Sequence, residues 1–338
     1  MGETAFRIDR RYRLFDSDSA FLGRFSVAVV LLCGSTAGLA GALERTEDVP
    51  PAILADDRGR DIRLSHFSRR IISLSPGITE LVYAAGAGDK LVGVDSYSNY
   101  PAAVKSVRQI GDASNLDLER IVALKPDLVI AWRGGNAAGD IRRLERLGLN
   151  VAATEASRLE DVPRLLRMIG RWAGTVPQAE SAAWIYEKEL QQIKRAYEDR
   201  KKISVVQLIW HQPLMTVNGN HIISDIISIC GGVNMFASAP TLTPLISIEN
   251  LLEAHPQAII SSVPPESGEN GREIHLAGWT NRSAVEGSHV IFIHPDLIHR
   301  QTPRILQAAR KVCAELDKIR SGWNRHISPF REPGGFPV

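Results

Sequence analysis

The sequence lacks the motifs that identify common enzymes. Its 338 residues contain no Walker loop, no dinucleotide-binding glycine pattern, no GxSxG elbow and no HExxH pair. It also lacks an excess of charge, since 40 Lys and Arg balance 38 Asp and Glu, which leaves no long basic run to neutralise a phosphate backbone. These absences argue against an enzyme of those classes and against a nucleic-acid partner.

Long apolar runs are also scarce, and the main one lies near the amino terminus. Arg24 precedes the apolar run 25–33, and the small residues Ala40, Gly41 and Ala42 follow it. This order is typical of a signal peptide, so we expect residues 1–42 to be a leader and signal peptide of an exported protein. The alternative is a membrane anchor, but the stretch 25–43 contains glycines and serines and barely reaches the ~20 apolar residues that span a bilayer.

Cysteine is rare as well, with only three in the chain. Export leaves two of them, Cys230 and Cys313, and an even number in an oxidising compartment favours a disulfide. Two separate buried thiols are the alternative.

What the sequence does contain is a regular alternation of short β-branched runs with longer amphipathic stretches. Such an alternation is typical of an α/β fold with largely parallel sheets. For a first lobe, residues 43–175, it predicts helices that begin at Thr79, Asp117 and Ala138. The predicted strands of this lobe are 70–74, 91–95, 128–132 and 151–154.

A long helix is predicted over 176–202, because Pro177 stands near its start and no glycine or proline interrupts it. It is long enough to connect two domains. The alternation then resumes in a second lobe, residues 203–320, with segments 204–210, 222–229, 256–262 and 290–293 and a final helix over 303–319. Residues 321–338, rich in proline and glycine, are predicted to be a flexible tail.

Eight of the nine histidines follow residue 210, but their spacings match no recognised metal-ligand set, so we predict no metal site. One of them, His211 or His299, is a candidate ligand for the metal of a bound chelate. A loop histidine that only forms hydrogen bonds is the alternative.

Two segments follow predicted strands with aromatic side chains. Residues 131–136 (AWRGGN) combine Trp132 and Arg133 with two glycines, and Tyr97 follows another strand. Ligands of open α/β sheets bind outside the carboxyl ends of the strands, so these segments are candidates for binding a large planar ligand. An isolated aromatic at either place is otherwise a packing residue.

The segment 117–136 (DLERIVALKPDLVIAWRGGN) resembles the cobalamin-binding receptors of ABC importers. These receptors belong to the helix-linked class of periplasmic binding proteins that serve cobalamin, haem and siderophores. The likeness continues through 71–76, 92–98, 230–236 and 302–305. It implies two Rossmann-like lobes joined by one backbone helix, a periplasmic location, a monomer, no resident cofactor and an ABC-transporter permease dimer as partner.

The resemblance also implies roles for particular residues. It maps a disulfide onto Cys230 and Cys313. It further implies that each lobe presents one glutamate to the permease, Glu119 in the first and Glu249 in the second. The alternative for both is a solvated first-turn residue that the helix dipole favours.

For the ligand, the resemblance maps an aromatic pair onto Tyr97 and Trp132 and an acidic residue onto Asp296. Together with Arg133 and Gly134 from the strand end, and with Trp210, these form the predicted binding site. Two positions where close relatives carry large aromatics are here Ala113 and Thr243, which reduces the apolar wall, and Trp210 is expected to compensate.

Two other functions remain open. Haem or a ferric siderophore is the alternative ligand, and for an anionic siderophore Arg133 with Arg300 or Arg304 would supply positive charge. A periplasmic metal-chelate enzyme or chaperone that uses the histidines of the second lobe is the third possibility.

Overall fold

The structure, a computed structural model, describes residues 54–262 and 288–326. By their contacts the residues form two units, 1–45 and 46–338, and every described residue belongs to the second. The predicted signal peptide, residues 1–42, lies outside the described residues. Within the described ranges, no helix combines the length and the apolar character that crossing a bilayer requires.

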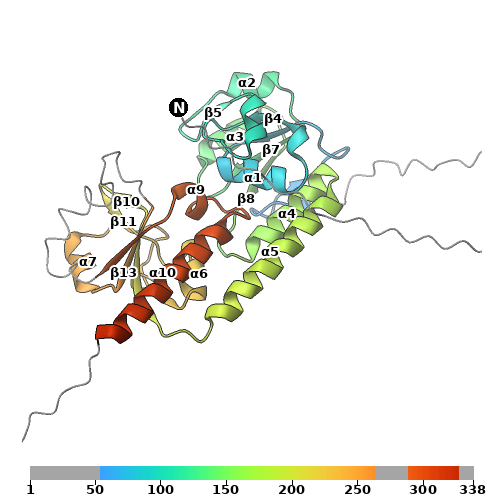
Figure 1. The fold of residues 1–338 in the computed structure, drawn as a ribbon. Helices are drawn as coiled ribbons and strands as arrows, with labels where there is room; N and C mark the ends of the chain where they lie inside the picture. Colours follow the sequence, from blue (N-terminus) through green and yellow to red (C-terminus); the bar gives the residue numbers. More distant parts are fainter. Residues whose placement is uncertain (1–53, 263–287, 327–338) are drawn as a thin grey trace, which may run out of the picture. The chain divides into compact units, whose positions relative to one another are not determined.

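The first half of the described chain builds a four-stranded parallel sheet around buried β-branched residues (Figure 1). Its strands lie in the order β4-β3-β7-β8. Their bounds are Ile71–Ser73 (β3), Leu91–Val94 (β4), Leu128–Trp132 (β7) and Val151–Thr154 (β8). We call this sheet and its helices the N lobe.

The second half builds another four-stranded parallel sheet, in the order β12-β9-β13-β14. Its strands are Ile203–Leu208 (β9), Gly232–Asn234 (β12), Ala258–Ser261 (β13) and His289–Phe292 (β14). We call this sheet and its helices the C lobe. In both lobes the second strand along the chain lies at an edge beside the first, and the third and fourth follow on the other side.

Helices cover these sheets. In the N lobe they are α1 (Pro76–Ala84), α2 (Leu118–Ala123), α3 (Ala138–Arg146) and α4 (Asp161–Ala173), with 3-10 turns η1 (Gly88–Lys90) and η2 (Ala102–Ser106). In the C lobe they are α6 (Ile222–Ile229), α7 (Ile248–Glu253), α9 (Pro295–Ile298) and α10 (Ile305–His326). Two-residue strands form the hairpins β1 (Leu54–Ala55) with β2 (Asp61–Ile62), β5 (Gly111–Asp112) with β6 (Asn115–Leu116), and β10 (Trp210–His211) with β11 (Leu214–Met215).

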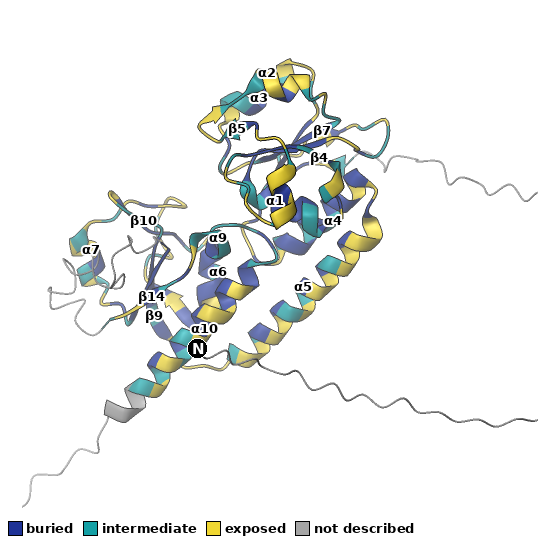
Figure 2. Ribbon diagram, turned by 45° about the horizontal axis from the view of Figure 1, so that its top comes forward, coloured by how far each residue is buried: buried dark blue, intermediate teal, exposed yellow. Residues whose placement is uncertain are grey.

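The helix α5 (Val176–Tyr197) connects the two lobes, as the sequence predicted. Its 22 residues span about 33 Å. One face, including Ala183, Tyr186 and Leu190, is buried, and the opposite face is exposed (Figure 2). The buried face belongs to one apolar cluster that includes the inner residues of both sheets, while each sheet has a separate cluster on its other face. The lobes therefore share a core and are not joined by the helix alone.

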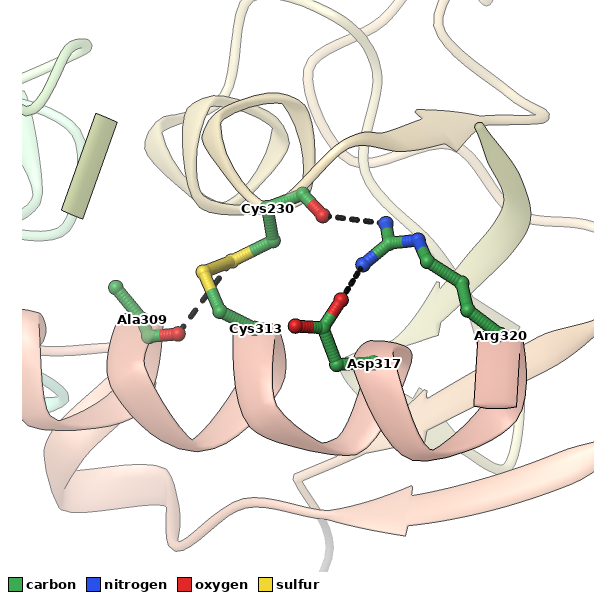
Figure 3. Close-up of a disulfide and its surroundings, with 5 residues drawn as sticks. All are labelled: Cys230, Ala309, Cys313, Asp317 and Arg320. Carbon is green, nitrogen blue, oxygen red and sulfur yellow. Dashed lines mark hydrogen bonds and ion pairs between the residues drawn. A yellow bond between two sulfur atoms is a disulfide. The ribbon is translucent and has the colours of Figure 1, made fainter. Parts of the chain in front are cut away.

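The predicted disulfide is present between Cys230, which follows α6, and Cys313 on α10 (Figure 3). Arg320 lies further along α10. It donates to the Cys230 carbonyl oxygen at 2.6 Å and pairs with Asp317 at 2.5 Å. The end of α6 is thus fixed to α10 by a covalent bond and by a guanidinium.

Some elements differ from the predictions. The helix α4 was not predicted, and α10 continues beyond Ile319 as far as His326, into the predicted tail. The linking helix ends at Tyr197, before the predicted residue 202. Helix α1 begins at Pro76 instead of Thr79, because Ser75 accepts a hydrogen bond from the Ile78 amide and caps the helix there.

Candidate functional site

In each sheet the second strand lies on one side of the first strand and the third strand lies on the other side, so the strand order reverses there. Ligands of open α/β sheets bind at such a reversal, outside the carboxyl ends of the strands. In the N lobe this point lies between the ends of β3 and β7, where Ser75 and Trp132 stand. In the C lobe it lies between the ends of β9 and β13, where Trp210 and Ser262 follow.

A cavity of about 170 Å³ is lined by residues of the N-lobe edge and by residues of the C lobe. Trp132 forms part of its N-lobe wall, and the turn between α9 and α10 forms its C-lobe wall. Its lining consists of Ser75, Pro76, Gly77, Ile78, Leu81, Trp132, Thr154, Leu165, His299, Arg300 and Gln301.

The turn after β7 holds the Trp132 ring in place. A Cβ atom on Gly135 would lie 1.9 Å from a ring carbon of Trp132, so the ring lies against backbone that only glycine leaves open. The indole nitrogen donates to Glu155 Oε1 at 3.2 Å. Asn136, buried, accepts from the Trp132 amide at 2.7 Å and donates to the Leu74 carbonyl at 3.0 Å, which ties this turn to the end of β3.

The loop after β4 contains Tyr97, which is 68% exposed. Asp95, which is buried below it, accepts a hydrogen bond from the Tyr97 amide at 2.8 Å. Burial raises the pKa of the Asp95 carboxyl to about 6, because desolvation and the nearby Asp112 charge outweigh the Tyr97 amide and the charge of Arg300.

Arg300 connects this loop to the C lobe. Its guanidinium contacts the carboxylate of Glu80 at 2.9 Å and that of Asp296 at 2.7 Å. It also donates to the Asn99 side chain at 2.7 Å, and Asn99 in turn donates to Asp296 at 3.0 Å. One arginine from the C lobe is therefore surrounded by acceptors from both lobes.

Glu80, on α1, binds a second arginine of the C lobe. Arg304 donates to both carboxylate oxygens of Glu80, at 2.8 and 2.6 Å, and its guanidinium lies 4.0 Å from the centre of the Tyr100 ring. The bond to Glu80 raises the pKa of Arg304 further above its ordinary value. The Glu80 side chain is only 2% exposed, so this ion cluster lies inside the contact between the lobes.

The C-lobe edge contains an exposed aromatic residue and two histidines that form hydrogen bonds with serines. Trp210 is 57% exposed, and its indole nitrogen donates to the Gln212 carbonyl at 2.8 Å. His211 Nε2 lies 3.3 Å from Ser261 Oγ, and His299 Nε2 lies 2.5 Å from Ser262 Oγ. Burial lowers the pKa of His299 to about 4, so this ring is neutral at neutral pH.

Three of the predicted ligand residues gather around Arg300. Trp132 lines the same cavity, Asp296 pairs with the guanidinium, and the Tyr97 carbonyl accepts from it at 3.4 Å. Arg133 is exposed and donates to the Asp57 carbonyl at 3.1 Å, and it does not line the cavity. Gly134 borders Glu155, and Trp210 stands in the β10–β11 hairpin of the C lobe.

Arg300 and Glu80 are the residues that the site prediction omitted. Arg300 is predicted from the sequence only as a counter-charge for a siderophore, and Glu80 is not a predicted site residue. Their contact joins residues 220 positions apart, and no local pattern in the sequence indicates such a pair. Ala113 and Thr243, the positions without the expected aromatics, are both exposed.

The two predicted docking residues occupy equivalent places in the lobes. Glu119 is the second residue of α2, after the capping Asp117, and Glu249 is the second residue of α7, after the capping Ser247. Both are exposed. Each helix leads into a residue with positive φ followed by proline, and then into the third strand of its sheet. The sequence around Glu249 is a weak second copy of that around Glu119.

The described residues contain no group of three or more His, Cys, Asp or Glu side chains arranged to hold a metal ion. The site instead combines one aromatic wall, a paired arginine cluster and two exposed aromatics.

Known proteins resemble this chain over most of the described part. Residues 71–297 match the family model described as periplasmic binding protein. The vitamin B12-binding protein of Pectobacterium carotovorum is 34% identical over 256 residues, which cover 75% of this chain and 90% of the relative.

Solved structures agree with this likeness. The periplasmic vitamin B12 binding protein of Vibrio cholerae is 31% identical, with a TM-score of 0.68 over 75% of this chain and 98% of that one. A periplasmic heme binding protein from Pseudomonas aeruginosa, 24% identical with a TM-score of 0.65 over 74% of this chain and 92% of that one, shares the fold.

Proposed function

We propose that this chain, which belongs to the periplasmic binding protein family, captures cobalamin or a related corrinoid between its lobes and delivers it to an ABC-transporter permease. Relatives named for vitamin B12 binding cover most of the chain and support this ligand. The observation that carries the proposal is the cavity in which the Trp132 wall of the N lobe faces the Arg300 turn of the C lobe.

The size of the cavity bears on how the ligand lies. A volume of about 170 Å³ is below the ~300 Å³ at which drug-sized ligands begin to be enclosed. The cavity therefore takes one edge of a macrocycle, and the remaining surface lies against side chains outside it. Tyr97 and Trp210, both more than half exposed, supply aromatic faces from the two lobes. Gly134 and Arg133 complete the N-lobe rim.

Charge favours a corrinoid over an anionic siderophore. Arg300 and Arg304 already pair with Glu80 and Asp296, and Arg133 hydrogen-bonds to a backbone carbonyl. An anionic ligand would have to compete with the carboxylates of Glu80 and Asp296 for these arginines, whereas an uncharged corrinoid edge can donate hydrogen bonds to the carboxylates. Haem remains the second candidate, because Trp132 and Tyr97 suit any flat macrocycle.

The chain acts in this proposal as a monomeric receptor in the periplasm, after removal of the signal peptide 1–42. It needs no resident cofactor and catalyses no reaction. Glu119 and Glu249, one on each lobe, meet the two subunits of a permease dimer. Complementary charges at such rims steer docking and fix its register.

The test is calorimetric titration of residues 43–338 with cyanocobalamin, with haemin and a ferric siderophore as parallel ligands. We expect saturable one-to-one binding of cobalamin, which Trp132→Ala weakens more than Trp210→Ala because Trp132 lines the cavity. Binding of haemin or the siderophore with no response to cobalamin would overturn the ligand and retain the receptor.

The enzyme or chaperone alternative has its own control. Cobalamin recovered after incubation with the protein is examined by its absorption spectrum. An unchanged corrinoid agrees with a receptor, whereas a product with altered axial or ring chemistry contradicts it.

A further inference from the structure

We propose that Glu155 is a positioning residue for the ligand site, which holds the Trp132 indole in its binding orientation and links that orientation to the C lobe. This inference rests on the proposed function, because it assigns Trp132 to the ligand wall. It concerns a residue that follows β8 and that the site prediction did not include.

The first observation is the contact itself. Glu155 Oε1 accepts from the Trp132 indole nitrogen at 3.2 Å. An indole has one donor, at one point of its edge, so the acceptor that it meets fixes the rotation of the ring about its side-chain bonds. Stacking on the Gly135 backbone fixes the tilt, since a Cβ there would lie 1.9 Å from the ring. Together the two contacts restrain both the rotation and the tilt of the ring.

The second observation is that Glu155 is itself held firmly. Its amide donates to Asp57 Oδ2 at 2.7 Å, and its carbonyl accepts from Arg164 at 2.8 Å. Arg164 also pairs with Asp57 at 2.6 Å. These bonds use the backbone of residue 155, so they persist when its side chain is replaced. Replacing the Glu155 side chain therefore leaves the backbone bonds to Asp57 and Arg164 in place.

The third observation is that the same carboxylate oxygen reaches the other lobe. Gln301 Nε2, in the turn before α10, lies 3.5 Å from Glu155 Oε1. Gln301 and Trp132 line the same cavity. Movement of the C lobe away from the N lobe would break this Gln301 contact, which is made at the same oxygen that accepts from the indole.

The experiment compares Glu155→Ala with Glu155→Gln, which retains an acceptor oxygen. Ligand-free protein is examined first, by the near-ultraviolet circular dichroism that Trp132→Phe removes. We expect Glu155→Ala to weaken this Trp132 signal and Glu155→Gln to preserve it. Gly135→Ala, which displaces the ring by a different route, serves as the positive control for a lost orientation.

Cyanocobalamin affinity is then measured for the same variants and in a Trp132→Phe background. Loss of one net hydrogen bond predicts a Kd about fivefold higher for Glu155→Ala, and little change for Glu155→Gln. In the Trp132→Phe background, which has no indole donor, Glu155→Ala should change Kd little, so the double-mutant cycle shows coupling.

Two results would overturn the inference. One is an unchanged Trp132 signal in Glu155→Ala, and the other is an equal loss of affinity in the wild-type and Trp132→Phe backgrounds. Failure of the wild-type protein to bind cobalamin would instead refute the proposed ligand, and the ligand-free spectra would still decide the role of Glu155.

Discussion

The two lobes have the same sheet order but stabilise their binding edges differently. At the N-lobe edge, charged carboxylates and a glycine turn orient Tyr97 and Trp132. At the C-lobe edge, His211 and His299 bond to serines that end and follow β13, and burial keeps His299 neutral. A disulfide holds the C-lobe helices together. One arrangement of strands thus supports two kinds of edge, one in which carboxylates orient aromatic residues and one in which histidines bond to serines, and the C lobe adds a disulfide between its helices.

The largest expected difference between the lobes comes from the disulfide. Replacing both cysteines in Cys230→Ala/Cys313→Ala removes a cross-link between residues 83 positions apart, for which loop-closure entropy predicts a loss of about 4 kcal/mol in the free energy of unfolding. Urea denaturation measures this loss. Hydrogen exchange should show faster opening in α6 and α10 than in α3, and a uniform increase over both lobes would contradict a local role.

The second prediction concerns the contact between the lobes. Glu80→Gln leaves two arginines with exposures of 11% and 19% without their common carboxylate, and breaking such a buried pair costs about 3 kcal/mol. Arg300 retains Asp296, whereas Arg304 loses its strongest partner. Urea denaturation, followed by separate probes in the two lobes, measures the loss.

Glu145→Gln is a matched control for this variant. Glu145 also pairs with two arginines, Arg58 and Arg60, but all three lie in the N lobe and the cluster is more exposed. Its loss should be smaller and should leave unfolding a single transition. If Glu80→Gln and Glu145→Gln behave alike, Glu80 has no special role between the lobes.

Strands β7 and β8 and helix α4 show which parts of the fold could be predicted from the sequence. Strands β7 and β8 were predicted with their observed bounds, because buried parallel strands appear as short continuous apolar runs. Helix α4 was missed, because Pro163 and Gly170 resemble helix breakers. Pro163 lies in the first helical turn, where its missing amide costs nothing, and Gly170 allows Ala179 of α5 to approach.

The candidate site was predicted less completely than the fold. Trp132 ends β7 and Tyr97 follows β4, so the sheet order brings them to one edge, and Asp296 is predicted from the resemblance alone. Glu80, Arg300 and Glu155 act through contacts that the tertiary fold alone creates, such as the one between Glu80 and Arg304. The local periodicity that predicts helices and strands carries no information about such pairs.

The third prediction is that lowering the pH changes the free energy of unfolding in opposite directions through the N-lobe edge and through the C lobe. The pKa of Asp95 is raised to about 6, so its ionisation disfavours the folded state, and its unfavourable contribution disappears as the pH falls from about 6 to 4. Asp95→Asn should therefore be more stable than wild type above pH 6, by about 3 kcal/mol, and the two should converge towards pH 4. Urea denaturation at pH 7, 5 and 4 measures this convergence.

His221 and His299 respond in the opposite direction. Burial lowers the pKa of each to about 4, so both are neutral in the folded protein, and their contribution to stability is lost as the pH falls from 6.5 to 4. His299→Gln, which retains a side chain able to bond to Ser262, should lose less stability on acidification than wild type. An equal loss in both would show that His299 stays uncharged or is solvated when protonated.

The smallest expected effect concerns Glu119 and Glu249, which occupy equivalent positions in the two lobes. Glu119→Gln and Glu249→Gln should each raise the receptor concentration that half-stimulates permease ATPase activity by a factor of about two to five, because exposed ion pairs contribute at most ~1 kcal/mol. The effect should shrink as salt is added, since screening weakens exposed charges. Glu253→Gln, at the other end of α7 and also exposed, is the control. If only one of the two lobes responds, the equivalent positions of Glu119 and Glu249 reflect a shared helix start and not a shared docking role.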